Sequence, residues 1–188
     1  MTIQYLDGGF ADPARDAAHA FRAALQAMAR PGRIETITGT APPAPCSVAA
    51  ASLILTLCDT TTPLYLAPSH DTDGLRGWIT FHTGAPFTGP EQAMFGLGTW
   101  AALQPVTRFA PGTPEYPDRA ATLIVEMETL SEVGATLTGP GIETTSSLSL
   151  PEIAAFQANR RRFPLGFDTY LTCGDRLAGL PRSTTVEG

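Results

Sequence analysis

The alternation of helix-like and strand-like segments constrains the fold of this chain more than any other feature. Apolar residues recur at helical spacing in residues 13–30, whereas residues 121–127 form a β-branched, apolar run typical of a buried strand. Residues 169–172 and 177–180 flank a turn at Gly174 and predict a hairpin. Helices between short strands, with an antiparallel end, predict an α/β protein with a mixed sheet covered by helices on both faces.

Four segments are predicted to be helical. Asp12 and Pro13 suit the start of the first helix, and Pro31-Gly32 suits its end. Ser47 suits the N-cap of a second helix, which is apolar nearly all round and should be buried. The third begins near Asp71 or Asp73, and the fourth follows Pro151. These predicted helices span about 13–30, 48–57, 73–80 and 151–161.

The remaining segments are predicted to be strands, turns and loops. Besides the hairpin and residues 121–127, short strands are expected at 34–37, 64–66 and 135–138, with a weaker one at 100–103. Residues 81–87 are predicted to leave the third helix as a loop, and Pro90-Glu91 to start another short helix. Prolines make residues 104–120 irregular. At 188 residues the chain suits a single domain, residues 1–188.

Composition excludes some chemistry. All 12 basic residues are arginine, so no lysine can form an aldimine with pyridoxal phosphate or serve a Walker A motif. The net charge of −6 disfavours nucleic acid and anionic membranes, and no apolar stretch is long enough to span a bilayer. Three widely spaced cysteines and an N-terminus without signal-peptide features predict a cytoplasmic protein.

Several residues are candidates for ligand-binding or catalytic groups. His82-Thr83-Gly84 offers an imidazole, a hydroxyl and a backbone N–H together, although a structural histidine is the alternative. His19 is expected near the buried face of the first helix, and His70 is expected to cap a helix or face solvent. Cys46 is expected to be a buried, inert thiol. No histidine pair has metal-ligand spacing, so neither a metal site nor a catalytic residue is predicted.

The residues from Gly96 to Ala101 match the sequence pattern of a dinucleotide-binding loop. That mechanism needs a strand before the glycines and a helix after them. Here a helix-like stretch precedes the glycines and Pro105 interrupts the segment after them, so a glycine-rich turn is the preferred interpretation.

Two arginine-containing segments could bind an anion or a partner. Arg160, Arg161 and Arg162 end the fourth helix, where they either complement its dipole or contact phosphate or an acidic partner surface. Arg182, followed by three hydroxyl residues on a short tail, is similar.

Seven motifs, in this order and spacing, resemble the family of the H subunit of the bacterial carbon–phosphorus lyase system, PhnH. The resemblance covers residues 10–186. The most specific motif is Phe81-His82-Thr83-Gly84-Ala85-Pro86. The others are Phe21-Arg22 with Met28-Ala29-Arg30-Pro31-Gly32; Asp59 with Thr62-Pro63-Leu64; Ala121-Thr122-Leu123; Leu137-Thr138-Gly139-Pro140-Gly141-Ile142; Phe163-Pro164-Leu165-Gly166-Phe167-Asp168; and Leu180-Pro181-Arg182-Ser183-Thr184-Thr185.

This resemblance implies a three-layer α/β/α fold like the large domain of pyridoxal-phosphate-dependent transferases, without that cofactor or any other. It implies a homodimer that assembles with the G, I and J subunits into a core complex. The G, H, I and L proteins are jointly needed to move ribose triphosphate from ATP to methylphosphonate, and the iron–sulfur J subunit later breaks the carbon–phosphorus bond. The family offers no settled catalytic residues to carry over to this chain.

The residues and the resemblance support three functional hypotheses. The leading one is an assembly or ligand-positioning subunit of the phosphonate-degrading complex without turnover of its own. The second is a small-molecule or phosphate-binding module whose pocket would be lined by His82, Thr83, Gly84, Gly139, Gly141 and Arg182. The third is a free-standing hydrolase that uses Cys46 or His82.

Overall fold

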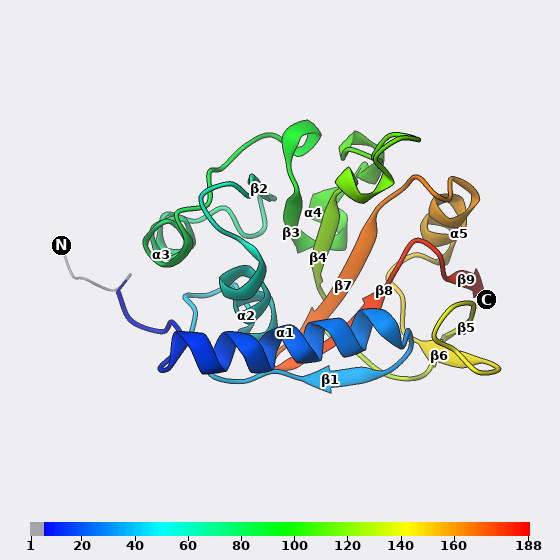
Figure 1. Ribbon diagram of the computed structural model, residues 1–188, viewed down its shortest axis with the longest axis horizontal. Coiled ribbons are helices and arrows are strands. Elements are labelled where there is room, and N and C mark those ends of the chain that lie inside the picture. Colours follow the sequence, from blue (N-terminus) through cyan, green and yellow to red (C-terminus); the bar gives the residue numbers. More distant parts are fainter. Residues whose placement is uncertain (1–5) are drawn as a thin grey trace.

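A six-stranded mixed sheet forms the centre of the computed structural model, which describes residues 6–188 (Figure 1). Its order is β1 (Ile34–Thr36), β8 (Arg176–Leu180), β7 (Asp168–Cys173), β4 (Thr122–Glu126), β3 (Phe95–Thr99) and β2 (Leu64–Leu66). Strands β2, β3, β4 and β7 are parallel, whereas β8 and β1 join antiparallel. The predicted mixed sheet and terminal hairpin are therefore confirmed.

Three helices pack on one face of the sheet. They are α1 (Pro13–Ala29), α2 (Val48–Leu57) and α3 (Asp73–Thr83). Small residues of α1, among them Ala24 and Ala27, pack with Trp78 of α3 and with Ile124 of β4 in one buried cluster. In Figure 1, α1 lies across the lower part of the view and α3 lies at the left end.

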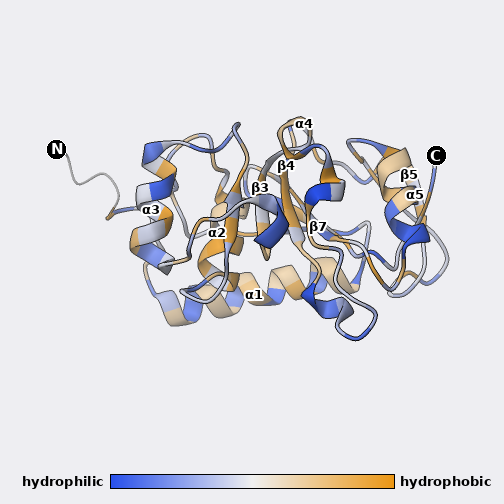
Figure 2. Ribbon diagram, turned by 90° about the horizontal axis from the view of Figure 1, so that it is seen from above, coloured by the Kyte–Doolittle hydropathy of each residue, from blue (hydrophilic) through white to orange (hydrophobic). Residues whose placement is uncertain are grey.

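The opposite face carries a second core. Leu123 and Val125 of β4 point into this core, which also contains Phe156 of α5 (Ile153–Arg161) and Leu103 of α4 (Trp100–Leu103). Because side chains alternate along a strand, the apolar sequence of β4, mostly hydrophobic in Figure 2, supplies both cores. The helices therefore lie on both sides of the sheet, as predicted.

A small second sheet lies beside α5, at the right end of Figure 1. Its order is β6 (Ser146–Leu148), β5 (Ala135–Thr138) and β9 (Thr185–Glu187). The segment after Arg182, expected to be a short tail, is thus a strand paired with β5. Three short 3-10 helices, η1 (Pro90–Gln92), η2 (Val106–Arg108) and η3 (Pro117–Arg119), complete the fold.

The predicted helix caps are present. The Asp12 carboxylate accepts a hydrogen bond from the backbone N–H of Arg15 at 3.3 Å, and Pro13 begins α1. The Ser47 hydroxyl accepts from the N–H of Ala50 at 3.1 Å. These local signals placed the starts of α1 and α2 correctly.

The prediction that residues 81–87 form a loop is wrong for the first three of them. Helix α3 continues through Phe81, His82 and Thr83, and it ends at Gly84, whose φ of +67° is the left-handed conformation of a helix C-cap. The Thr83 hydroxyl donates to the Ile79 carbonyl at 2.8 Å and so supports the last turn.

The predictions for residues 96–103 are also wrong. Residues 100–103 are the helix α4 and not a strand, while Gly96 and Gly98 lie inside β3 and not in a turn. A Cβ on Gly96 would lie 2.8 Å from the Phe109 ring, and one on Gly98 would lie 2.5 Å from Cβ of Ala67. Tertiary packing therefore requires glycine in this strand despite its low β propensity.

No helix within residues 6–188 is long and apolar enough to cross a membrane. Residues 1–5 carry most of the segment that we interpret as unlike a signal peptide, and they lie outside the described part of the chain.

Candidate functional site

Buried polar side chains gather where the parallel strands end. Glu126 ends β4, Thr172 lies near the end of β7, and Ser69-His70 follows β2. Together with Ser47, the N-cap of α2, these residues form what we call the Glu126 cluster. In α/β sheets the carboxyl ends of parallel strands are where ligands usually bind, so this cluster is the first candidate site.

Glu126 is held by hydrogen bonds to both oxygens. Its Oε1 accepts from the backbone N–H of Ser47 at 2.7 Å, and its Oε2 accepts from the Thr172 hydroxyl at 3.0 Å. The side chain of Glu126 is only 11% exposed, and its charge lies at the N-terminus of α2, where the helix dipole favours an anion. The carboxylate thus fastens α2 to two strands of the sheet.

Ser69 and His70 form the other half of the cluster. The Ser69 hydroxyl oxygen accepts from the N–H of Thr99 at 3.1 Å and lies 2.9 Å from Nδ1 of His70. Nε2 of His70 has no hydrogen-bond partner and lies 3.8 Å from Oε1 of Glu126, which is too long for a hydrogen bond. Because the Ser69 oxygen is already bonded to β3, the arrangement is suited to fixing the loop after β2.

His70 does not have the role expected from the sequence. It is 2% exposed, and the hydroxyl of Thr72, not His70, caps α3 by accepting from the N–H of Leu75 at 3.2 Å. Sequence reasoning also missed Ser69 and Glu126. The available signal was their position directly after or at the end of predicted strands, where parallel strands bring separate segments together.

Cys46 lies beside this cluster and is buried, as predicted. Burial, with a smaller contribution from the Glu126 charge, raises the pKa of its thiol well above the ordinary value. The thiol therefore stays protonated at neutral pH and is a poor nucleophile.

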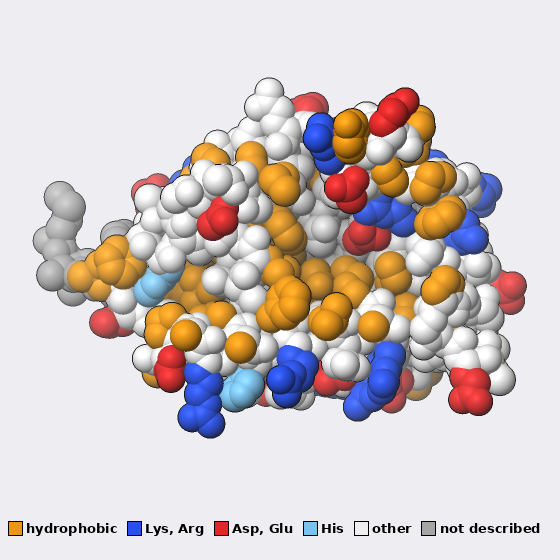
Figure 3. Space-filling model, in the orientation of Figure 1, with side chains coloured by type: hydrophobic (Ala, Val, Ile, Leu, Met, Phe, Trp, Pro, Cys, Tyr) orange, Lys and Arg blue, Asp and Glu red, His pale blue; other side chains and the backbone are white. Residues whose placement is uncertain are grey.

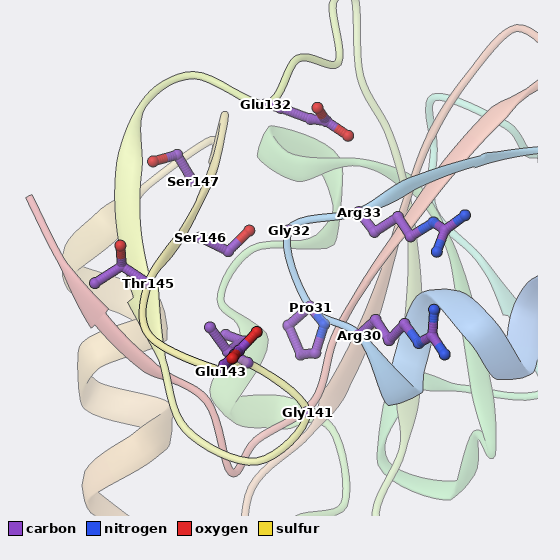
Figure 4. A pocket seen from close by; sticks show the side chains of 11 residues that line it. Arg30, Pro31, Gly32, Arg33, Glu132, Gly141, Glu143, Thr145, Ser146 and Ser147 are labelled. Atoms are coloured by element: carbon purple, nitrogen blue, oxygen red, sulfur yellow. The ribbon is translucent and has the colours of Figure 1, made fainter.

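A polar groove lies between the turn after α1 and the loop that leads into β6 (Figure 4). Its volume is about 510 Å³, and its lining includes Arg30, Arg33, Glu132, Glu143 and Gly141. In Figure 4 the two arginine side chains point away from Thr145 and Ser147. Arg33 is also paired with Glu35 at 2.9 Å, so the groove lacks two convergent free guanidinium groups.

The groove brings together two segments that carry motifs of the resemblance. A Cβ on Gly32 would collide with the Ser146 hydroxyl, and one on Gly141 would collide with the Ala29 carbonyl. Both glycines have positive φ, at +93° and +83°. Glycine at these positions is required by the close approach of the two backbones.

The structure places His82, Thr83 and Gly84 at the end of α3. The His82 ring packs against Trp78 and Phe81, with ring centroids 4.8 and 4.9 Å apart. The Thr83 hydroxyl bonds within the helix and its loop. His19, expected near a buried face, is exposed on α1.

The other predicted ligand residues lie at the opposite end of the molecule (Figure 1). Gly139 and Gly141 follow β5 in the small sheet, where Gly139 approaches the backbone of Ser183. The structure therefore does not bring them to the His82 segment, and the predicted common pocket is not formed.

The guanidinium group of Arg182 is hydrogen-bonded to other residues of the protein. Its Nη2 and Nε donate to the Asp168 carboxylate at 2.6 and 3.1 Å, and its Nη1 donates to the Pro117 carbonyl at 2.6 Å. The side chain is only 12% exposed. By contrast, Arg161 and Arg162 at the end of α5 are exposed, and Arg160 lies over the Phe163 ring at 5.1 Å.

The polar side chains of the Glu126 cluster bond mainly to other parts of the fold. Within residues 6–188, no group of three or more His, Cys, Asp and Glu side chains could hold a metal ion. The buried polar groups connect segments of the fold, whereas Arg161 and Arg162 are exposed on the surface. The fold and these sites define a mixed α/β protein whose polar clusters organise its loops.

Comparison with known proteins identifies the family. Residues 8–187 match the family described as "Bacterial phosphonate metabolism protein (PhnH)", and the chain belongs to this family. It is 42% identical to "Alpha-D-ribose 1-methylphosphonate 5-triphosphate synthase subunit PhnH" of Rhizobium meliloti (strain 1021), over 98% of this chain and 96% of the relative. It is 30% identical to "Putative C-P lyase subunit protein HtxG" of Stutzerimonas stutzeri, over 89% and 84%.

Proposed function

We propose that this protein is a subunit of a bacterial carbon–phosphorus lyase complex, where it serves assembly or ligand positioning in phosphonate catabolism. The observation that carries the proposal is the 42% identity to a synthase subunit along 98% of the chain. Its partners would be the G, I and J subunits. With the G, I and L proteins it would support transfer of ribose triphosphate from ATP to methylphosphonate.

The polar interior supports a role without independent turnover. The most nucleophilic type of side chain near the Glu126 cluster is the Cys46 thiol, and burial keeps it protonated because its pKa is raised. The Ser69 oxygen is already bonded to β3. A free-standing hydrolase would need a deprotonated Cys46 thiol or a free His82 imidazole, and the His82 ring packs against aromatic rings.

The proposal includes a homodimer of single-domain chains, residues 1–188, in the cytoplasm. We also propose that the three-layer fold is structurally related to the large domain of pyridoxal-phosphate-dependent transferases. Because the sequence contains no lysine, a protein with this fold could not form the internal aldimine with pyridoxal phosphate. Its fold would then serve assembly instead of that chemistry.

Co-expression tests the complex directly. The tagged chain is purified together with co-expressed G, I and J subunits, and the mass of the assembly and of the isolated chain is measured. We expect a stable complex, and a dimer for the chain alone. If the chain elutes without the other subunits at low salt, the proposed function is wrong.

A small-molecule site is a second candidate because the groove next to Gly141 is large and polar. Hydroxyl groups of residues 145–147 and the carboxylates of Glu132 and Glu143 suit the hydroxyls of a ribose better than a phosphate group. Calorimetry with ribose 5-phosphate, ATP and methylphosphonate tests this. Heat that is lost on Glu143→Ala would support the groove, and the absence of heat with all three compounds would exclude it for them.

A further inference from the structure

One surface of the molecule combines exposed guanidinium groups with exposed aromatic rings. It is formed by Tyr116, Arg119, Arg161, Arg162 and Phe163, and we call it the arginine–aromatic surface. Tyr116 and Phe163 are each 51% exposed. In Figure 3, basic and hydrophobic side chains, with some acidic ones among them, lie at the upper right, over the loops and α5.

Arg182 holds the two halves of this surface together. Its Nη1 donates to the carbonyl of Pro117 at 2.6 Å and approaches that of Pro164 at 3.5 Å. Asp168 fixes the same guanidinium through both of its oxygens. The loop at 116–119 and the loop at 161–164, which are far apart in sequence, are therefore adjacent.

The surface is held in place before any partner binds. Arg119 lies over the Tyr116 ring at 4.0 Å, and Arg160 lies over the Phe163 ring at 5.1 Å. The N–H of Gly166 bonds to the Pro111 carbonyl at 3.0 Å, which links the segments next to the two loops. Groups that are fixed in advance lose less conformational entropy on binding.

Within the described part of the chain, the exposed guanidinium groups have no acidic partner. None of the salt bridges found within residues 6–188 involves Arg119, Arg161 or Arg162. Residues 115–119 and 160–163 together contain four arginines and two acidic residues, although the whole chain has a net charge of −6. The surface is therefore a local positive region on an acidic molecule.

A small cleft adjoins Arg162. It has a volume of about 220 Å³ and is lined mostly by apolar groups, including Pro105, Val106, Ala155 and Phe167. Arginine, tyrosine and phenylalanine are enriched at protein interfaces, and hot spots place an apolar anchor beside charged groups.

We propose that the arginine–aromatic surface is the docking site for an acidic segment of a partner protein, with carboxylates at Arg161 and Arg162 and an apolar side chain in the adjoining cleft. The inference rests on the proposed function, since it assigns one contact of the complex. A protein partner is favoured over nucleic acid because the acidic remainder of the chain repels a polyanion that extends beyond the surface. Arg182 acts as a positioning residue that keeps the two loops together.

The test uses charge reversal with a matched control. The double variant Arg161→Glu/Arg162→Glu is compared with Arg15→Glu/Arg22→Glu, which reverses two exposed arginines on α1. Each is co-expressed with the G, I and J subunits, and the affinity for the assembly is measured at 50 and 300 mM salt. We expect at least about tenfold weaker binding of the first variant and a reduced salt dependence, with no change in the control.

The outcomes separate this inference from the proposed function. If the unmodified chain does not bind the other subunits, the proposed function fails. If it binds and the Arg161/Arg162 variant binds equally well, the docking surface is wrong while the function stands. A loss in the α1 control alone would also overturn it. Fluorescence anisotropy with a Glu-rich peptide and with single-stranded oligo(dT) decides the class of partner, because tighter binding of oligo(dT) would contradict an acidic protein segment.

Discussion

Polar side chains gather in two regions of the molecule, and the regions differ in what those side chains contact. In the Glu126 cluster, the Glu126 carboxylate accepts hydrogen bonds from Ser47 and from Thr172, and these three residues belong to different elements. On the arginine–aromatic surface, Arg161 and Arg162 are exposed and form no salt bridge with the rest of the described chain.

This difference in contacts indicates two roles: the Glu126 cluster stabilises the fold, whereas the arginine–aromatic surface can bind a partner. A buried charge is tolerated only when its hydrogen bonds are made, so the Glu126 cluster contributes mainly to stability. An exposed arginine contributes little to stability, so its groups remain available to a partner. The comparison predicts that substitutions in the first region change unfolding and that substitutions in the second change binding.

The largest effect is expected for Glu126→Ala. It leaves the Ser47 N–H without its acceptor and the Thr172 hydroxyl with only the Val125 carbonyl, at 3.3 Å, and we expect the free energy of unfolding to fall by about 3 kcal/mol. Urea unfolding followed by circular dichroism measures the change. Glu126→Gln, which keeps one amide oxygen, should lose less. If Glu126→Ala were as stable as the unmodified protein, the cluster would not hold the strands together.

The next effect is expected for Arg182→Ala, because Arg182 is a mostly buried structural residue that also fastens the loops of the arginine–aromatic surface. Loss of the hydrogen bonds to Asp168 and Pro117 should lower the free energy of unfolding by about 2 kcal/mol. It should also weaken binding to the G, I and J subunits, because the two loops are no longer fastened. Thermal unfolding and co-purification measure the two effects. A destabilised variant that binds normally would show that the surface does not depend on Arg182.

Alkaline pH should destabilise the interior by a smaller amount. Burial, and secondarily Asp59, raises the pKa of Cys58 from 9.0 to about 12, and burial with Asp168 raises that of Tyr170 from 10.0 to about 12. The unfolded chain therefore releases these protons first. Stability is complete below pH 9 and is lost as the pH rises toward 12, with a loss of about 1.8 kcal/mol by pH 10.

Urea unfolding at pH 8 and pH 10 checks this sign, and Cys58→Ala should reduce the difference between the two values. A free energy of unfolding that rises between these pH values would contradict the raised pKa values.

The smallest effect on stability is expected for Arg161→Glu/Arg162→Glu. Because both side chains are exposed, the free energy of unfolding should change by less than about 1 kcal/mol, mainly through the reversed charge at the C-terminus of α5. Differential scanning calorimetry measures it. A large loss of stability would mean that these arginines support the fold, and the contrast between the two regions would disappear.

Local signals predicted much of the fold. The caps at Asp12 and Ser47, the apolar run of β4 and the turn at Gly174 each lie where the sequence placed them. The failures lie where distant residues decide the conformation. Strand β3 has glycine at positions 96 and 98 because Phe109 and Ala67, which are distant in sequence, leave no room for a Cβ.

The candidate sites were less predictable. Arg161 and Arg162 were identified from sequence as partner-contact candidates, and their exposure is consistent with that role, which the charge-reversal experiment tests. Arg182 was grouped with the ligand-binding residues because its partners, Asp168 and Pro117, cannot be inferred from its neighbours in sequence. His70 lacked any local sign that it would be buried beside Glu126.

The sequence by itself determined the helices and strands that have strong periodicity and caps, the absence of lysine chemistry, and a collinear set of motifs typical of one family. Only the tertiary structure decided which polar residues are internal and which are exposed. The physical reason is that propensity and capping act over a few residues, whereas the partners of Glu126 and Arg182 lie 46 to 79 and 14 to 65 residues away and meet only when the sheet has formed.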